Sequence, residues 1–132
     1  MRAHPILRPV FVVALLAAAC APRSGMDGSA YVVVFEPNSA GLDAPGQAVV
    51  ENAAKVARAD IDRPVIVASY AAPATITTPA AEFLVSRSRA QAVTNALVNH
   101  GIAQSRIVQR PRIATGRDPG SEMRRVEIVL GN

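Results

Sequence analysis

The sequence predicts an α+β fold: a two-layer βαβαββ sandwich with two helices packed on one face of a mixed sheet. Runs of β-forming residues alternate with two segments of helical periodicity, and the last two runs have no helix between them. Gly and Pro cluster between these segments, as they do in loops. With 132 residues, half of them hydrophobic, the chain is long enough for one domain but not for two.

Residues 1–19 are typical of a secretory signal peptide. Arg2 and Arg8 form a basic start, and residues 9–19 are apolar after the initial proline. A membrane-spanning helix needs about 20 apolar residues, so this run is short for that role. A buried core helix is the alternative, but the segment lacks the polar face that a packed surface helix has.

Cys20, the only cysteine, follows the apolar run directly, so no intrachain disulfide is possible. Residues 16–20 resemble the lipobox of bacterial lipoproteins, although Ala17 stands where that motif usually has leucine. The resemblance implies that Cys20 is acylated and that it anchors the chain in the outer membrane, with the domain in the periplasm. Residues 20–29 are then a lipidated N-terminus and tether, and residues 30–132 are the domain.

The first strand and the first helix are expected early in this domain. Ala30–Phe35 is a run of β-forming residues, which predicts a strand buried on both faces. A helix is expected from Asp43 or Ala44 to near Asp60, because Pro45 falls in its first turn. One apolar face of this helix consists of Val49, Ala53 and Val56.

A second buried strand is expected at Val65–Tyr70, and a well-marked helix follows it. Thr78 suits the N-cap of this helix and Pro79 its first position. Gly101 suits a left-handed C-terminal cap, after which Ile102 can pack back on the end of the apolar face. That face has residues spaced three and four apart, which are Ala90, Val93 and Leu97.

Two strands complete the domain. Arg106–Ile113 alternates in character, and Pro111 within it favours an edge position or a bulge, because proline has no N–H for a ladder. Arg124–Leu130 also alternates, with Val126 and Ile128 separated by polar residues, which predicts a half-exposed strand.

The composition argues against several classes of function. Without Arg2 and Arg8 the chain has 12 basic and 10 acidic residues, so its charge is weak evidence for nucleic-acid binding. The chain has no Trp and few other aromatic residues to stack on bases. His4 and His100 are the only histidines, which argues against a catalytic triad and a zinc cluster. We expect no enzyme activity, no cofactor and no nucleic acid.

Four stretches resemble the OmpA-like peptidoglycan-binding domain of OmpA C-terminal, Pal and MotB proteins. They are residues 34–42 (first strand and loop), 85–97 followed by Gly101-Ile102 (helix motif and glycine cap), Arg106-Ile107 (third strand) and 124–128 (closing strand). The similarity extends from Ala30 to Leu130. It implies this fold and a domain that contacts peptidoglycan non-covalently, and Pal-type members carry a lipoprotein signal in front of it.

The resemblance also implies a ligand and a site. In the family an Asp takes the amine of meso-diaminopimelate in the peptidoglycan stem peptide, and the Arg of the helix motif takes a carboxylate. Arg89 matches that Arg, but Ala72 stands in the place of the Asp. Losing one charge-assisted bond costs about 1.5–3 kcal/mol. Glu82, two turns before Arg89, is the candidate replacement acid; it and Met123 stand where the family usually has Asn.

Three further residues are candidate ligand contacts, each with a structural alternative. Asn38 has a loop position near the family's ligand and also suits a turn. Tyr70 ends a strand, where tyrosines commonly pack or donate a hydrogen bond. Arg125 could close the site from the last strand or pair with a neighbouring acid. Arg87 is expected on a solvated face, and His100 at the helix end, where it favours the dipole.

Two functions follow from these residues. In the first, the chain is an outer-membrane-anchored periplasmic lipoprotein that tethers the membrane to peptidoglycan. In the second, the domain has lost wall binding and is a protein-interaction module of an envelope complex, which Ala72, Glu82 and Met123 favour. A small groove that holds an acid near Arg89 would favour the first function, and a filled apolar surface would favour the second.

Overall fold

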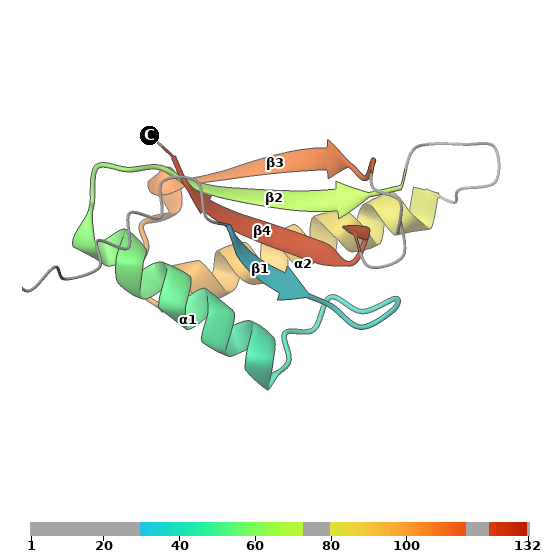
Figure 1. The fold of residues 1–132 in the computed structure, drawn as a ribbon, viewed down its shortest axis with the longest axis horizontal. Coiled ribbons are helices and arrows are strands. Elements are labelled where there is room, and N and C mark those ends of the chain that lie inside the picture. The colour runs from blue at the N-terminus through green and yellow to red at the C-terminus, as the bar shows by residue number, and fades with distance from the viewer. Residues whose placement is uncertain (1–29, 73–79, 116–121, 132) are drawn as a thin grey trace, which may run out of the picture.

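The structure, a computed structural model, describes residues 30–72, 80–115 and 122–131. Cys20, the expected signal peptide and tether, Thr78 and Pro79 lie outside these residues. The described elements are β1 (Tyr31–Val34), α1 (Ala44–Ala59), β2 (Val65–Ala71), α2 (Ala80–Asn99), a short 3₁₀ turn (Gln104–Arg106), β3 (Ile107–Ile113) and β4 (Arg125–Leu130). The predicted βαβαββ order is confirmed (Figure 1).

The sheet is mixed, and its strands lie in the order β1-β4-β2-β3. β4 pairs antiparallel with both β1 and β2, whereas β2 and β3 are parallel. Parallel neighbours need a long crossover, and α2 lies in that connection. β3 forms one edge of the sheet, so Pro111 has the edge position that the sequence predicts.

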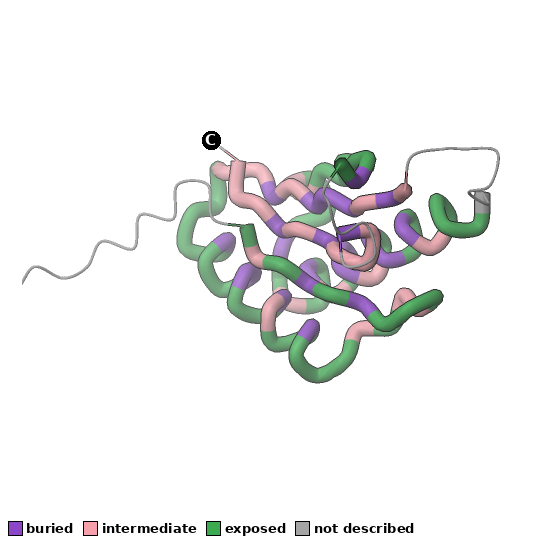
Figure 2. The backbone as a smooth tube through the Cα atoms, turned by 45° about the vertical axis from the view of Figure 1, so that its right-hand side comes forward, coloured by how far each residue is buried: buried purple, intermediate pink, exposed green. Residues whose placement is uncertain are grey.

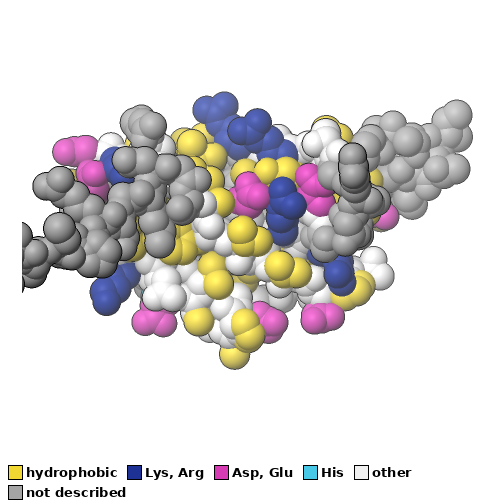
Figure 3. All heavy atoms as spheres, viewed as in Figure 1, with side chains coloured by type: hydrophobic (Ala, Val, Ile, Leu, Met, Phe, Trp, Pro, Cys, Tyr) yellow, Lys and Arg dark blue, Asp and Glu magenta, His cyan; other side chains and the backbone are white. Residues whose placement is uncertain are grey.

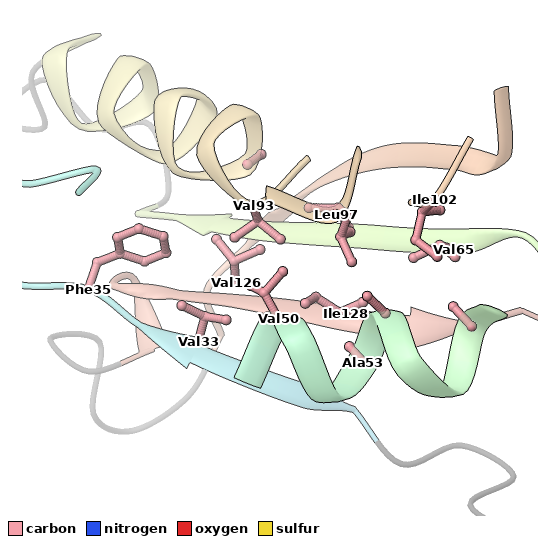
Figure 4. Packing of buried hydrophobic residues seen from close by; sticks show 14 residues of the cluster. Val33, Phe35, Val50, Ala53, Val65, Val93, Leu97, Ile102, Val126 and Ile128 are labelled. Atoms are coloured by element: carbon pink, nitrogen blue, oxygen red, sulfur yellow. The ribbon is translucent and has the colours of Figure 1, made fainter. Parts of the chain in front are cut away.

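Both helices cover the same face of the sheet, α1 mainly over β1 and α2 mainly over β2 (Figure 1). The inward-facing residues of the strands and the inner sides of the helices are buried (Figure 2). Small alanines on α1 allow close packing, because Ala53, Ala54 and Ala57 are all fully buried. Figure 4 shows Val50 of α1 and Val93 of α2 directed at Val126 of β4.

β1 differs from the prediction that it is buried on both faces. Val33 is buried against the helices, but Val32 is 42% exposed and Val34 is 53% exposed. The prediction was wrong because β1 lies at the edge of the sheet, and no described element covers the face opposite the helices. A run of β-forming residues therefore marks a strand here without implying a central one.

The ends of the helices follow the sequence signals. Asp43 caps α1, since its Oδ1 accepts a hydrogen bond of 2.8 Å from the N–H of Gly46. Gly101 ends α2 with φ +89° and donates its N–H to the carbonyl of Val98. Ile102 donates to the carbonyl of Leu97, which completes a Schellman motif, and both side chains are buried as predicted.

Candidate functional site

A pocket of about 310 Å³ opens where the β1–α1 loop, the end of β2, the start of α2 and the turn before β4 meet. We call it the Arg89 pocket. Its lining consists of Pro37, Asn38, Ala71, Ala72, Ala81, Glu82, Val85, Arg89, Met123 and Arg124. The fold thus brings three candidate ligand residues together, which are Asn38, Glu82 and Arg89, and places Ala72 beside them. This is a small groove and not a filled apolar surface.

Arg89 is 5% exposed and donates to three carbonyls of two backbone segments. Its Nε donates to the carbonyl of Ser39 at 2.7 Å, and its Nη1 donates to that of Met123 at 3.0 Å. Its Nη2 donates to the carbonyl of Glu36, also at 3.0 Å. Arg89 therefore fixes the β1–α1 loop against the turn before β4, and both segments line the pocket.

The same guanidinium remains able to contact a ligand. It has five N–H groups, and three of them are used by these carbonyls. It lies 5.5 Å from the centre of the Phe35 ring, which makes a cation–π contact. Burial lowers the pKa of Arg89, and the positive charge of Arg124 lowers that pKa further. An anion in the pocket would relieve both effects.

Glu82 contributes a carboxylate to the same pocket. Glu82, Val85 and Arg89 are spaced three and four apart on α2 and share one face. Glu82 is exposed, and within the described residues its carboxylate has no hydrogen bond or ion pair. The replacement acid proposed from the sequence thus lines the pocket two turns from Arg89, without pairing with it.

Arg124 lines the pocket, and the sequence argument missed it in favour of Arg125. Val126 and Ile128 of β4 are buried toward the helices, and side chains alternate along a strand. Arg124 has the same parity as Val126, so it lies on the helix side of the sheet. The alternation that predicted the core of β4 was the signal that could have identified Arg124.

Arg125 and Tyr70 lie outside the Arg89 pocket, because both belong to the opposite face of the sheet. The Arg125 guanidinium lies 4.3 Å from the centre of the Tyr70 ring. Arg125 Nε lies 2.9 Å from Glu127 Oε1, and the Tyr70 hydroxyl donates to Glu127 Oε2 at 2.9 Å. The expected closure of the pocket by Arg125 is therefore corrected: the structure shows the alternative, a pair with a neighbouring acid.

The groups around Arg125 favour its charged form. Burial alone would lower the pKa of Arg125, but the hydrogen bond with Tyr70 and the charges of Glu127 and Glu122 outweigh it and raise that pKa. Figure 3 views the open face of the sheet, where acidic and basic side chains lie side by side over its middle. Tyr70, Arg125 and Glu127 are not among the residues that line the Arg89 pocket.

Asn38 combines its two expected roles. Its φ of 55° is in the left-handed region, which Asn tolerates better than most residues, so it forms the turn of the β1–α1 loop. It also lines the Arg89 pocket. His100 lies at the end of α2, as expected, and its carbonyl accepts a hydrogen bond from Arg58.

Neither described helix is long and apolar enough to cross a bilayer. Among the described residues, no three His, Cys, Asp or Glu side chains group as metal ligands would.

Residues 34–122 match the model of the OmpA family. The chain belongs to this family. Membership in this family agrees with the expectation that the chain is a binding domain and not an enzyme. No match was found among curated proteins.

Solved structures share the fold at low sequence identity. The OmpA-like domain of FopA1 from Francisella tularensis subsp. tularensis SCHU S4 is 20% identical, with a TM-score of 0.64 over 76% of this chain and 70% of that one. The peptidoglycan-associated lipoprotein from Burkholderia pseudomallei is 20% identical, with a TM-score of 0.61 over 76% and 89%. The C-terminal domain of Helicobacter pylori MotB is 18% identical, with a TM-score of 0.60 over 79% and 84%.

Proposed function

We propose that the chain is a lipoprotein, anchored in the outer membrane through Cys20, whose domain holds the peptidoglycan stem peptide in the Arg89 pocket. One observation carries the proposal: a single small pocket is lined by an acid, Glu82, and by two arginines, Arg89 and Arg124. The amine and carboxylate of diaminopimelate need this combination of charges. Glu82 takes the role of the missing Asp.

In this proposal each charged group of the pocket has its own task. The exposed Glu82 carboxylate binds the amine of the ligand, because it has no partner among the described residues. The two remaining N–H groups of Arg89 bind the ligand carboxylate, and the charge of Arg124 strengthens this contact. The carbonyl bonds of Arg89 hold its guanidinium in place before the ligand arrives.

The sequence before β1 supports the anchor. An acylated Cys20 would be followed by nine residues before the domain begins at Ala30. Ten extended residues span at most about 35 Å, so the domain would stay close to the membrane. Replacing Cys20 with Ser should abolish incorporation of radiolabelled palmitate and release the chain from the membrane fraction. Unchanged labelling in that variant would refute the anchor.

Wall binding can be tested by co-sedimentation with purified sacculi. Every residue of the hydrophobic core lies between Tyr31 and Leu130, so a soluble chain that begins at Ala21 keeps the whole core. We expect this chain to sediment with sacculi and Glu82→Gln to bind about tenfold more weakly, since one charge-assisted bond is lost. Glu51→Gln changes an exposed acid on α1, and should bind like the parent. If the parent itself stays in the supernatant, the proposal is wrong.

Ala72 favours a second candidate, a domain that has kept the fold but serves as an interaction module for other envelope proteins. Ala72 lines the pocket without the carboxylate that the family places there. In that case the parent should not bind sacculi, and Ala72→Asp should create binding. A parent that already binds, with Glu82→Gln impaired, would eliminate this candidate.

A further inference from the structure

A second pocket lies on the other flank of α2, between this helix and strands β2 and β3. Its volume is about 270 Å³, and it shares no lining residue with the Arg89 pocket. We call it the Ser86 pocket. The lining residues that matter are Ser69, Phe83, Ser86, Arg87, Gln109 and Pro111.

Two largely buried serines direct hydroxyls to this pocket that have no partner in the described part of the chain. Ser69 and Ser86 are each 4% exposed. Within the described residues, neither hydroxyl makes a hydrogen bond, although a helical serine such as Ser86 can bond the carbonyl one turn earlier. Neither hydroxyl is among the fully buried polar atoms that lack a partner, so both reach the cavity, where solvent or a ligand can pair with them.

The other polar groups of the pocket are the carboxamide of Gln109 and the positive charge of Arg87. Gln109 Nε2 donates to Thr94 Oγ1 at 2.9 Å and to Gln91 Oε1 at 3.3 Å, so its carboxamide is held in place. Arg87 is exposed and has no ion pair in the described part of the chain. A single cation beside two neutral hydroxyls matches a singly charged carboxylate better than a doubly charged phosphate.

The remaining walls are apolar. Phe83 is 51% exposed at the rim, and Pro111 forms part of the opposite side on β3. Such a pair can contact a small apolar side chain next to the carboxylate. The cavity is too small for a folded partner surface but can hold one terminal residue of a peptide.

We infer that the Ser86 pocket binds the free carboxylate of a short peptide. Arg87 contacts the carboxylate, the hydroxyls of Ser69 and Ser86 donate to it, and Phe83 and Pro111 contact the neighbouring side chain. Assignment to a wall peptide rests on the proposed function. The first turns of α2 separate the two pockets. A helix with its side chains is about 10–12 Å across, which is the length of roughly three extended residues. One peptide network can therefore reach both.

The test is an NMR titration of the ¹⁵N-labelled chain from Ala21 with N-acetyl-D-alanyl-D-alanine. We expect shifts of the amide signals around Ser86 and Gln109, with affinity at least tenfold lower for the C-terminal amide of the same peptide. Arg87→Gln should weaken binding about tenfold. Arg110→Gln is the matched control, because Arg110 is an exposed arginine of β3 on the opposite face from Gln109.

Three results would overturn the inference: no shifts at this pocket, equal binding of the amide, or unchanged binding by Arg87→Gln. Tighter binding of N-acetyl-L-alanyl-L-alanine would overturn the wall assignment and indicate a protein C-terminus. Glu82→Gln should leave the titration unchanged. Failure of wall binding at the Arg89 pocket is therefore distinguishable from failure at the Ser86 pocket.

Ser86→Ala gives a second readout that a structural hydroxyl would not give. Removing a hydroxyl that solvent reaches and that has no partner within the described fold should leave the melting temperature nearly unchanged while weakening peptide binding several-fold. A lower melting temperature with unchanged binding would show that the Ser86 hydroxyl stabilises the fold and does not contact the peptide.

Discussion

Arg89→Met should destabilise the domain strongly, because Arg89 is buried and binds three backbone carbonyls. A hydrogen bond from a charged donor contributes about 1.5–3 kcal/mol when its partners are buried. Glu36 is exposed, and Ser39 and Met123 are half-buried, so water can reach the abandoned carbonyls and the loss is closer to 1 kcal/mol each. We therefore expect about 3 kcal/mol of lost unfolding free energy.

The measurement is urea unfolding followed by circular dichroism on the chain from Ala21. With a slope of about 1.5 kcal/mol per molar urea, a loss of about 3 kcal/mol lowers the midpoint by about 2 M. Arg87→Met is the control, because it changes an exposed arginine on the same helix and should alter stability by less than about 0.5 kcal/mol. Similar urea midpoints for both variants would refute the conclusion that the hydrogen bonds of Arg89 stabilise the fold.

The expected loss of unfolding free energy in an Arg89 variant also decides which residue should be changed to test wall binding. A typical domain is stable by about 5–15 kcal/mol, so losing about 3 kcal/mol leaves a markedly weakened fold. Loss of sacculus binding by an Arg89 variant would then report unfolding as well as ligand contact. Glu82 avoids this problem, because its carboxylate has no described partner within the fold.

Three further predictions concern the helix ends, each measured by urea unfolding. Gly101→Ala should cost about 1–2 kcal/mol because Gly101 has φ +89°, and Gly101→Asn should cost less; equal losses would contradict a conformational cause. Asp43→Ala should cost about 1 kcal/mol, and retained stability would show that its bond to Gly46 is dispensable. Arg106→Met should cost about 2 kcal/mol, because Arg106 binds the carbonyls of Ala57 and Asp60 at the end of α1; a neutral effect would exclude this cap.

The helix caps, which local sequence determines, were predicted correctly, but the predicted apolar face of α1 was not: Val56 is 43% exposed, and Val50 lies in the core instead. Asp43 and Gly101 cap their helices through contacts with residues at most three positions away, and Ile102 packs against Leu97 within the same motif. The βαβαββ order followed from periodicity within each segment. The family match agrees with the motif around Arg89, which is itself local to one helix.

The features that escaped prediction depend on distant residues. The carbonyls that Arg89 binds lie 34, 50 and 53 residues away in the chain, and no local pattern identifies them. The exposure of Val32 and Val34 depends on which strand lies at the sheet edge. Which of Arg124 and Arg125 lines the Arg89 pocket depends on the face of the sheet to which each belongs. The alternation of side chains along the strand could have predicted this.

The two halves of α2 differ in which side chains they bury. Its second half buries apolar residues such as Val93 and Leu97, as a core helix should. Its first half buries Ser86 and Arg89 but exposes Phe83, at 51%, and Leu84, at 59%. Natural proteins depart from such local rules mainly at functional sites. Because the Arg89 pocket and the Ser86 pocket lie on the two flanks of this first half, the inverted pattern is what two ligand-binding surfaces on one helix would require.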